Sequence, residues 1–122
     1  METHNHNIIY LFHIFFVGSI LIYVGIKQNN IYKPFYNFLL FLGALIIIFH
    51  SYKVYTNIQL HKNYIINILH IVLFAPVLLY IGYNQENTHR IYYEFLLMIG
   101  FAAIGYHLYY LLLTNIFNPF TS

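Results

Sequence analysis

The chain has 122 residues, of which 61% are hydrophobic and only 7% are charged, and its formal net charge is +2. Soluble domains carry about 25% charged residues, so the composition excludes an ordinary soluble fold and predicts an all-α integral membrane protein. The chain has no cysteine, which excludes disulfides and thiolate metal sites. No basic stripe is visible, so a nucleic-acid partner is not expected.

The first two predicted elements are apolar stretches at residues 8–26 and 35–55, separated by a short polar segment. Each is close to the length of about 20 residues that a helix needs to cross a hydrocarbon core. Helices are expected because unpaired backbone groups are costly in lipid. Gly25 is expected to cap the first helix at its C-terminal end, and Pro34 to precede the second.

The third and fourth predicted helices cover residues 65–83 and 91–113, and a polar segment separates them from the first pair. Gly82 is expected to cap the third helix, as Gly25 caps the first. Pro76 lies inside the third stretch and predicts a kink there. We therefore expect one multi-pass transmembrane domain over residues 1–122, with both termini on the same side of the membrane.

An internal repeat relates the two halves of the chain. Shifting the sequence by 57 positions aligns residues 8–57 with residues 65–114, and 17 of the 50 pairs are identical without a gap. Identical pairs of His, Gly, Gln and Tyr carry more weight than matched Leu or Ile, because membrane helices share a restricted alphabet. The repeat predicts an up-down-up-down bundle of four helices, built from two parallel-repeat helical hairpins.

Four histidines lie within the predicted helices, one in each, and they match in pairs across the repeat: His13 with His70, and His50 with His107. At 1.5 Å per residue, all four lie within about 5 Å of one depth, near the face that carries the termini. A titratable group inside a membrane span predicts a functional site. In an up-down-up-down bundle the matched histidines would face one another diagonally, as His13/His70 and His50/His107.

Four further residues are expected to support these histidines. Gly43 and Gly100 lie seven residues before His50 and His107, hence on the same helical face, where a missing side chain would leave room for a flat cofactor. Asn67 precedes His70 by three residues and is expected to orient its imidazole, and Tyr10 is expected to do the same for His13.

The leading hypothesis is ligation of haem b or of a transition metal (Zn, Cu or Fe) by His13, His50, His70 and His107, with electron transfer as the associated function. Catalysis is not indicated, and an enzymatic role would be that of a membrane redox component. Two other hypotheses stay open. One is a non-catalytic anchor or accessory subunit of a larger organellar or viral assembly. The other is a proton channel or relay gated by histidine.

The expected partners follow from these hypotheses. The lipid bilayer covers the apolar surface, and other membrane subunits or further copies of the chain are the expected protein partners.

Overall fold

The structure is a computed structural model that describes residues 2–117. Every regular element in this range is helical, and the described part of the chain contains no strand. Four helical segments are long and apolar enough to cross a membrane: His6–Asn30, Pro34–Gln59, Ile65–Asn87 and Arg90–Ile116. The prediction of an all-helical chain with four such segments is therefore confirmed.

Three of the four segments are composite, because short π-helical or 3-10 turns interrupt or end them. The elements are α1 (Glu2–Leu11), η1 (Phe12–Val17), α2 (Gly18–Lys27), η2 (Gln28–Asn30), α3 (Pro34–Gln59), α4 (Ile65–Leu69), η3 (His70–Phe74), α5 (Ala75–Asn84), η4 (Gln85–Asn87), α6 (Arg90–Leu112) and η5 (Leu113–Phe117).

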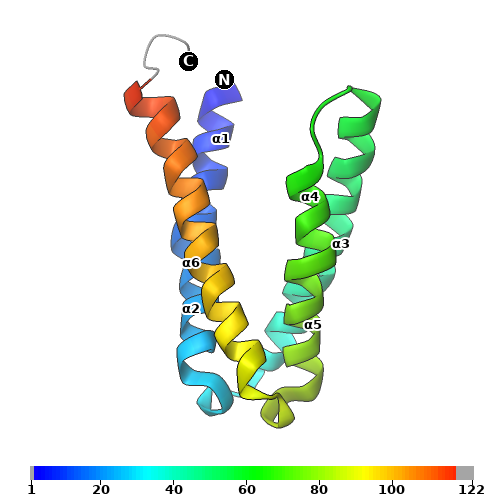
Figure 1. The fold of residues 1–122 in the computed structure, drawn as a ribbon, viewed down its shortest axis with the longest axis vertical. Coiled ribbons are helices and arrows are strands. Elements are labelled where there is room, and N and C mark those ends of the chain that lie inside the picture. The colour runs from blue at the N-terminus through cyan, green and yellow to red at the C-terminus, as the bar shows by residue number, and fades with distance from the viewer. Residues whose placement is uncertain (1, 118–122) are drawn as a thin grey trace. The chain divides into compact units, whose positions relative to one another are not determined.

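Contacts divide the chain into two compact units, and Figure 1 shows the helices of each side by side. Among the described residues, unit 1 contains residues 2–27 and 94–117, and unit 2 contains residues 28–93. In unit 2, α3 packs against α4, η3 and α5, which follow it directly in the chain. In unit 1, α1, η1 and α2 lie along α6, which is far from them in sequence.

Glycines bring the helices of each unit close together. In unit 1, a Cβ atom built on Gly25 would lie 2.8 Å from Cβ of Leu97. In unit 2, a Cβ atom on Gly82 would lie 2.7 Å from Cγ of Leu40. Small residues at a membrane helix interface allow such close approach, and the dispersion contacts that result hold the helices together.

These close contacts occur at positions that the sequence repeat matches. Gly25 and Leu97 in unit 1 correspond, at the offset of 57, to Gly82 and Leu40 in unit 2. Each unit thus combines the first helical segment of one sequence copy with the second segment of the other. The compact units of the structure and the repeated segments of the sequence are therefore different divisions of the chain.

The expected role of Gly25 and Gly82 as helix caps is wrong. Both glycines are buried inside α2 and α5, and no described glycine has a positive φ. The positive φ occurs three residues later, at Gln28 (53°) and Gln85 (51°). The glycines are needed for close helix packing, so glutamine adopts the unusual conformation in the turn.

A π-helical turn occurs at matched places in the two copies, in η1 and in η3. The backbone N–H of Gly18 donates to the carbonyl of His13, and that of Ala75 donates to the carbonyl of His70. Pro76, which lacks an N–H, is the second residue after the end of η3 and is matched by Ser19 in the first copy. The backbone irregularity expected from Pro76 thus has a counterpart in a copy without proline. Single π-helical turns are frequent at functional sites.

Candidate functional site

In unit 2, His50 of α3 and His70 of η3 form a stacked pair. Their ring centroids are 4.0 Å apart and the ring planes differ by 17°. His70 donates from Nδ1 to the carbonyl oxygen of Ile66 at 2.7 Å. His50 donates from Nδ1 to Oδ1 of Asn67 at 2.8 Å. Both rings are half-buried.

In unit 1, His13 of η1 and His107 of α6 form a second pair. Their ring centroids are 4.3 Å apart and the planes differ by 31°. His13 donates from Nδ1 to the carbonyl oxygen of Ile9 at 2.8 Å, one helical turn earlier. His107 is buried, and the ring of Tyr10 lies beside it with centroids 5.9 Å apart.

The two pairs are equivalent in sequence, since His13 matches His70 and His107 matches His50. Each pair contains one histidine from each copy, on helices that pack directly against each other. The pairs seen within the units are His13/His107 and His50/His70, because the packed helices of each unit are the first and fourth segments or the second and third. The expected diagonal pairing of His13 with His70 and of His50 with His107 stays a prediction.

Hydrogen bonds determine the tautomer of three of these rings. A carbonyl oxygen can only accept, so Nδ1 of His13, His50 and His70 must carry the proton. In the neutral ring the lone pair then lies on Nε2. A histidine that binds a metal through Nε2 has the same arrangement, with Nδ1–H held by a carbonyl or carboxylate oxygen.

The supporting residues act differently from the expectation. Asn67 bonds to His50 across the helix pair rather than to His70 on its own helix. His70 instead turns toward the carbonyl of Ile66, which leaves the amide of Asn67 directed at α3. Tyr10, at the matching position, lies against His107 and its ring makes the contact.

The room expected beneath the histidines is filled. A Cβ atom on Gly43 would meet Cγ of Leu79 at 2.8 Å, and one on Gly100 would meet Cγ1 of Ile22 at 3.2 Å. These glycines permit close helix packing, so the space their missing side chains leave is taken by the neighbouring helix.

Each histidine pair offers two nitrogen donors. Among the residues that the structure describes, no group of three or more His, Cys, Asp or Glu side chains gathers in a way that could hold a metal ion. The rings of His50 and His70 stack, whereas those of His13 and His107 are tilted by 31°. An ion at the usual Zn–N distance of about 2.0 Å cannot lie in both planes of the stacked pair, so ligation by both His50 and His70 requires one ring to turn.

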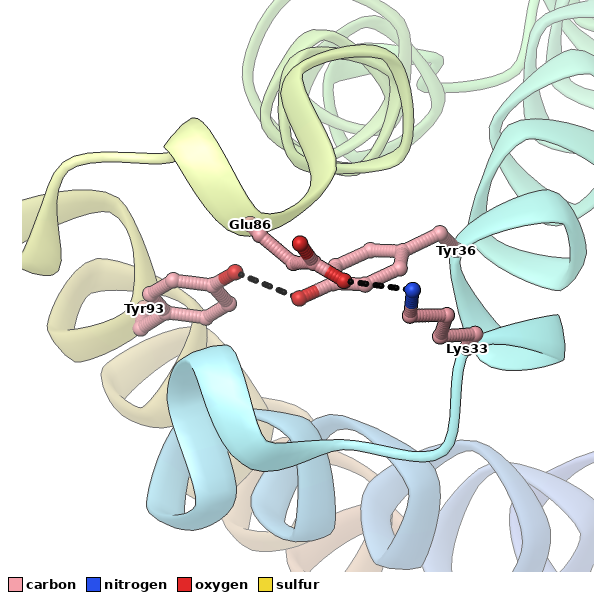
Figure 2. A network of polar contacts seen from close by, with 4 residues as sticks. All are labelled: Lys33, Tyr36, Glu86 and Tyr93. Atoms are coloured by element: carbon pink, nitrogen blue, oxygen red, sulfur yellow. Dashed lines mark hydrogen bonds and ion pairs between the residues drawn. The ribbon is translucent and has the colours of Figure 1, made fainter.

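A second polar cluster lies at the short-loop end of unit 2 (Figure 2). The hydroxyls of Tyr36 and Tyr93 are 3.3 Å apart, and both side chains are buried. Tyr93 donates to the carbonyl oxygen of Gln85 at 3.1 Å. Lys33 and Glu86 form an exposed ion pair nearby, with Nζ and Oε1 3.3 Å apart. This cluster was not predicted, although Tyr36 and Tyr93 match at the repeat offset.

No protein-family model matches the chain, and neither curated proteins nor solved structures match it. The fold and the site define a class: an α-helical protein with four potential membrane spans and a pair of contacting histidines in each of two helix pairs.

Proposed function

We propose that this is a multi-pass integral membrane protein that binds a transition-metal ion through Nε2 of paired histidines. The observation that carries the proposal is the hydrogen bonding of Nδ1 in His13, His50 and His70, each to an oxygen that can only accept. This bonding gives all three rings the tautomer that ligates through Nε2. Imidazole nitrogen suits Zn, Cu and Fe.

The same bonds favour ligation over a proton relay. A relay through imidazole needs one ring nitrogen to take up a proton while the other releases one. In His13 and His70 the releasing atom would be Nδ1, whose partner is a backbone carbonyl. A carbonyl oxygen is too weak a base to accept that proton and pass it on.

A bare ion fits the surroundings better than haem b. Helix packing next to Gly43 and Gly100 fills the space that suggested a flat cofactor. Two protein donors per pair leave coordination positions for water or for another ligand. A site of this kind suits an exchangeable ion, and electron transfer would follow if the ion is copper or iron.

We also propose that both termini lie on one side of the membrane, near the histidines. Asn7 of α1 and Asn115 of η5 support this, because their side-chain amides bond to each other at 3.1 Å and 3.2 Å.

The test is elemental analysis and an absorption spectrum of the purified full chain in detergent. The matched variant carries alanine at His13, His50, His70 and His107. A control variant, H61A/H89N, removes two exposed loop histidines. In the native chain the backbone N–H of Ile91 donates to Nδ1 of His89, and the side-chain oxygen of the asparagine can accept the same hydrogen bond. We expect stoichiometric Zn, Cu or Fe in the native chain and in the control, and its loss in the four-alanine variant.

Other outcomes identify the competing functions. A Soret band that the four-alanine variant lacks would replace the bare ion by haem. Equal, substoichiometric metal in all three proteins would overturn ligation. Proton flux into liposomes that depends on the histidines would then indicate a relay, and its absence an anchor or accessory subunit.

A further inference from the structure

We infer that the Tyr36–Tyr93 cluster is a two-state switch, in which the tyrosine hydroxyls hold the turn of one sequence copy or of the other, but not both at once. The inference goes beyond the proposed function and does not depend on a bound ion. Tyr36 and Tyr93 occupy the same position in the two copies, and their hydroxyls are 3.3 Å apart (Figure 2). Residues that contact their own counterparts lie on a local two-fold axis.

The turns beside these tyrosines are also counterparts of each other. η2 begins at Gln28 and η4 begins at Gln85, the two turns are in contact, and the two glutamines have similar positive φ angles of 53° and 51°. The carbonyl oxygen of each glutamine accepts from the backbone N–H three residues later, at 3.4 Å in η2 and 3.1 Å in η4. Tyr36 follows Gln28 by eight residues, as Tyr93 follows Gln85. Each tyrosine thus has an equivalent carbonyl acceptor in its own copy.

The number of hydroxyl protons makes the two turns compete. Tyr93 donates its single proton to the carbonyl of Gln85 at 3.1 Å, so the bond between the hydroxyls uses the proton of Tyr36. In the exchanged arrangement, Tyr36 donates to the carbonyl of Gln28, and Tyr93 donates to Tyr36. If each tyrosine bound its own turn, two buried oxygens would face each other with no proton between them. One turn is therefore held at a time.

A surface ion pair favours the arrangement in this structure. Glu86 lies in η4, the turn that Tyr93 holds, and its Oε1 is 3.3 Å from Nζ of Lys33, which belongs to the first copy (Figure 2). The position in η2 that matches Glu86 is Asn29, which carries no charge. The ion pair therefore stabilises η4 beside the tyrosines, and the matched position supplies no such carboxylate to η2. Loss of the Glu86 charge should raise the population of the exchanged arrangement.

The experiment is carbon-13 NMR of the full chain in detergent micelles, labelled at the backbone carbonyls of glutamine. The chain has three glutamines, so the spectrum contains one signal for each turn and one for Gln59 at the end of α3. The chemical shift of a carbonyl carbon changes when its oxygen gains or loses a hydrogen bond. The Gln28 and Gln85 signals thus report which turn is held, and an unchanged Gln59 signal confirms that a variant folds like the native chain.

Two conservative variants define the ends of the range. In Tyr93→Phe the only remaining hydroxyl is that of Tyr36, and we expect the Gln28 signal to shift as its carbonyl gains a bond, while the Gln85 signal shifts in the opposite direction. The new bond uses the less favourable acceptor, so it replaces only part of what the substitution removes. Tyr36→Phe keeps the bond from Tyr93 to Gln85. The native signals should lie between the two variants, closer to those of Tyr36→Phe.

Glu86→Gln tests the bias without altering either tyrosine. We expect it to move the Gln28 and Gln85 signals toward their positions in Tyr93→Phe. The ratio of the two arrangements should change by about twofold, because an exposed ion pair contributes little free energy. Lys62→Gln is the control, since it removes an exposed charge in the middle loop and should leave both signals unchanged.

Two results would overturn the switch. If the Gln28 signal does not move in Tyr93→Phe, then Tyr36 does not take up the second acceptor. If the native signals coincide with those of Tyr36→Phe and Glu86→Gln does not move them, the chain has a single arrangement. Neither result depends on metal content, so the switch and the proposed function can fail independently.

Discussion

Unit 1 and unit 2 are two versions of one antiparallel helix pair that differ in how the chain connects them. In unit 2, a short turn after α3 leads directly into α4, so the partners are consecutive. In unit 1, all of unit 2 separates α2 from most of α6. Despite this difference, both units place a glycine against a leucine and a histidine against a histidine at matching positions.

In both units, side-chain contacts rather than the chain connection select the packed partner. Residue pairs in unit 1 run in opposite directions along the two helices, since Gly18 meets Ile104 and Gly25 meets Leu97. In unit 2, Gly43 meets Leu79 and Gly82 meets Leu40 in the same manner. In both units the helices therefore approach each other closely at glycine. Substitution of these glycines tests whether the two helix pairs are packed in the same way.

The largest effect is expected from Gly82→Ala in unit 2 and Gly25→Ala in unit 1. The added carbon at Gly82 would lie 2.8 Å from the backbone oxygen of Tyr36, and that at Gly25 would lie 3.0 Å from Cα of Leu97. Backbone atoms cannot move aside as a side-chain end can. We expect each variant to lower the free energy of unfolding by about 1–3 kcal/mol, measured by thermal or denaturant unfolding in micelles.

Two controls sharpen this prediction. A Cβ atom on Gly43 would meet only the end of the Leu79 side chain within 3.0 Å, so Gly43→Ala should cost less than Gly82→Ala. Gly105 has nothing within 4 Å of an added Cβ, and Gly105→Ala should leave stability unchanged or raise it by up to about 1 kcal/mol. If Gly25→Ala behaves like Gly105→Ala, the helix pair of unit 1 is not packed as in unit 2.

The next effect concerns the matched tyrosines. Tyr93 makes two bonds, since it donates to Gln85 and accepts from Tyr36. Tyr93→Phe removes both bonds, so the buried hydroxyl of Tyr36 and the carbonyl of Gln85 each lose a hydrogen-bond partner. We expect a loss of about 1–3 kcal/mol in unfolding free energy. Tyr36→Phe removes one bond and should cost about half as much. Equal losses would mean that both tyrosines bind their short-loop turns in the same way.

A smaller effect is expected from Asn67→Leu in the chain without metal. The variant deletes the acceptor of His50 Nδ1, so the His50 ring should lose its single tautomer, while the rings of His13 and His70 keep theirs. Nitrogen-15 NMR of the imidazoles measures this directly. The stability cost of the lost hydrogen bond should be about 1 kcal/mol. An unchanged His50 spectrum would show that Asn67 does not fix the tautomer.

Much of this arrangement could be predicted from sequence. The lengths of the apolar stretches predict four spanning helices, and the matched histidines could be found because identical polar residues are rare in such segments. The positions of His13, His50, His70 and His107 along their helices also follow from counting residues. Each of these features can be read from a single residue or a single apolar stretch, without knowing which helices pack together.

The pairing of helices could not be predicted in the same way. Residues that face lipid and residues that face another helix are both apolar, so periodicity does not reveal which face packs. The partner of Asn67 depends on that pairing, which is why His50 rather than His70 receives its bond. Gly25 and Gly82 lie near the ends of their apolar stretches, which suggests helix caps. The close contact that requires each glycine comes from a neighbouring helix, and the sequence does not give the position of that helix.

The smallest effect is expected at the exposed end of the short-loop cluster, where Lys33 and Glu86 lie beside the buried tyrosines (Figure 2). Their side chains are 80% and 53% exposed, so water and salt screen the attraction. Lys33→Gln should change the unfolding free energy by less than about 0.5 kcal/mol. Unfolding in low and high salt provides the measurement. A larger loss of unfolding free energy that depends on salt would mean that the Lys33–Glu86 ion pair stabilises this end of the unit. The buried Tyr36–Tyr93 contact would then contribute less to stability than expected.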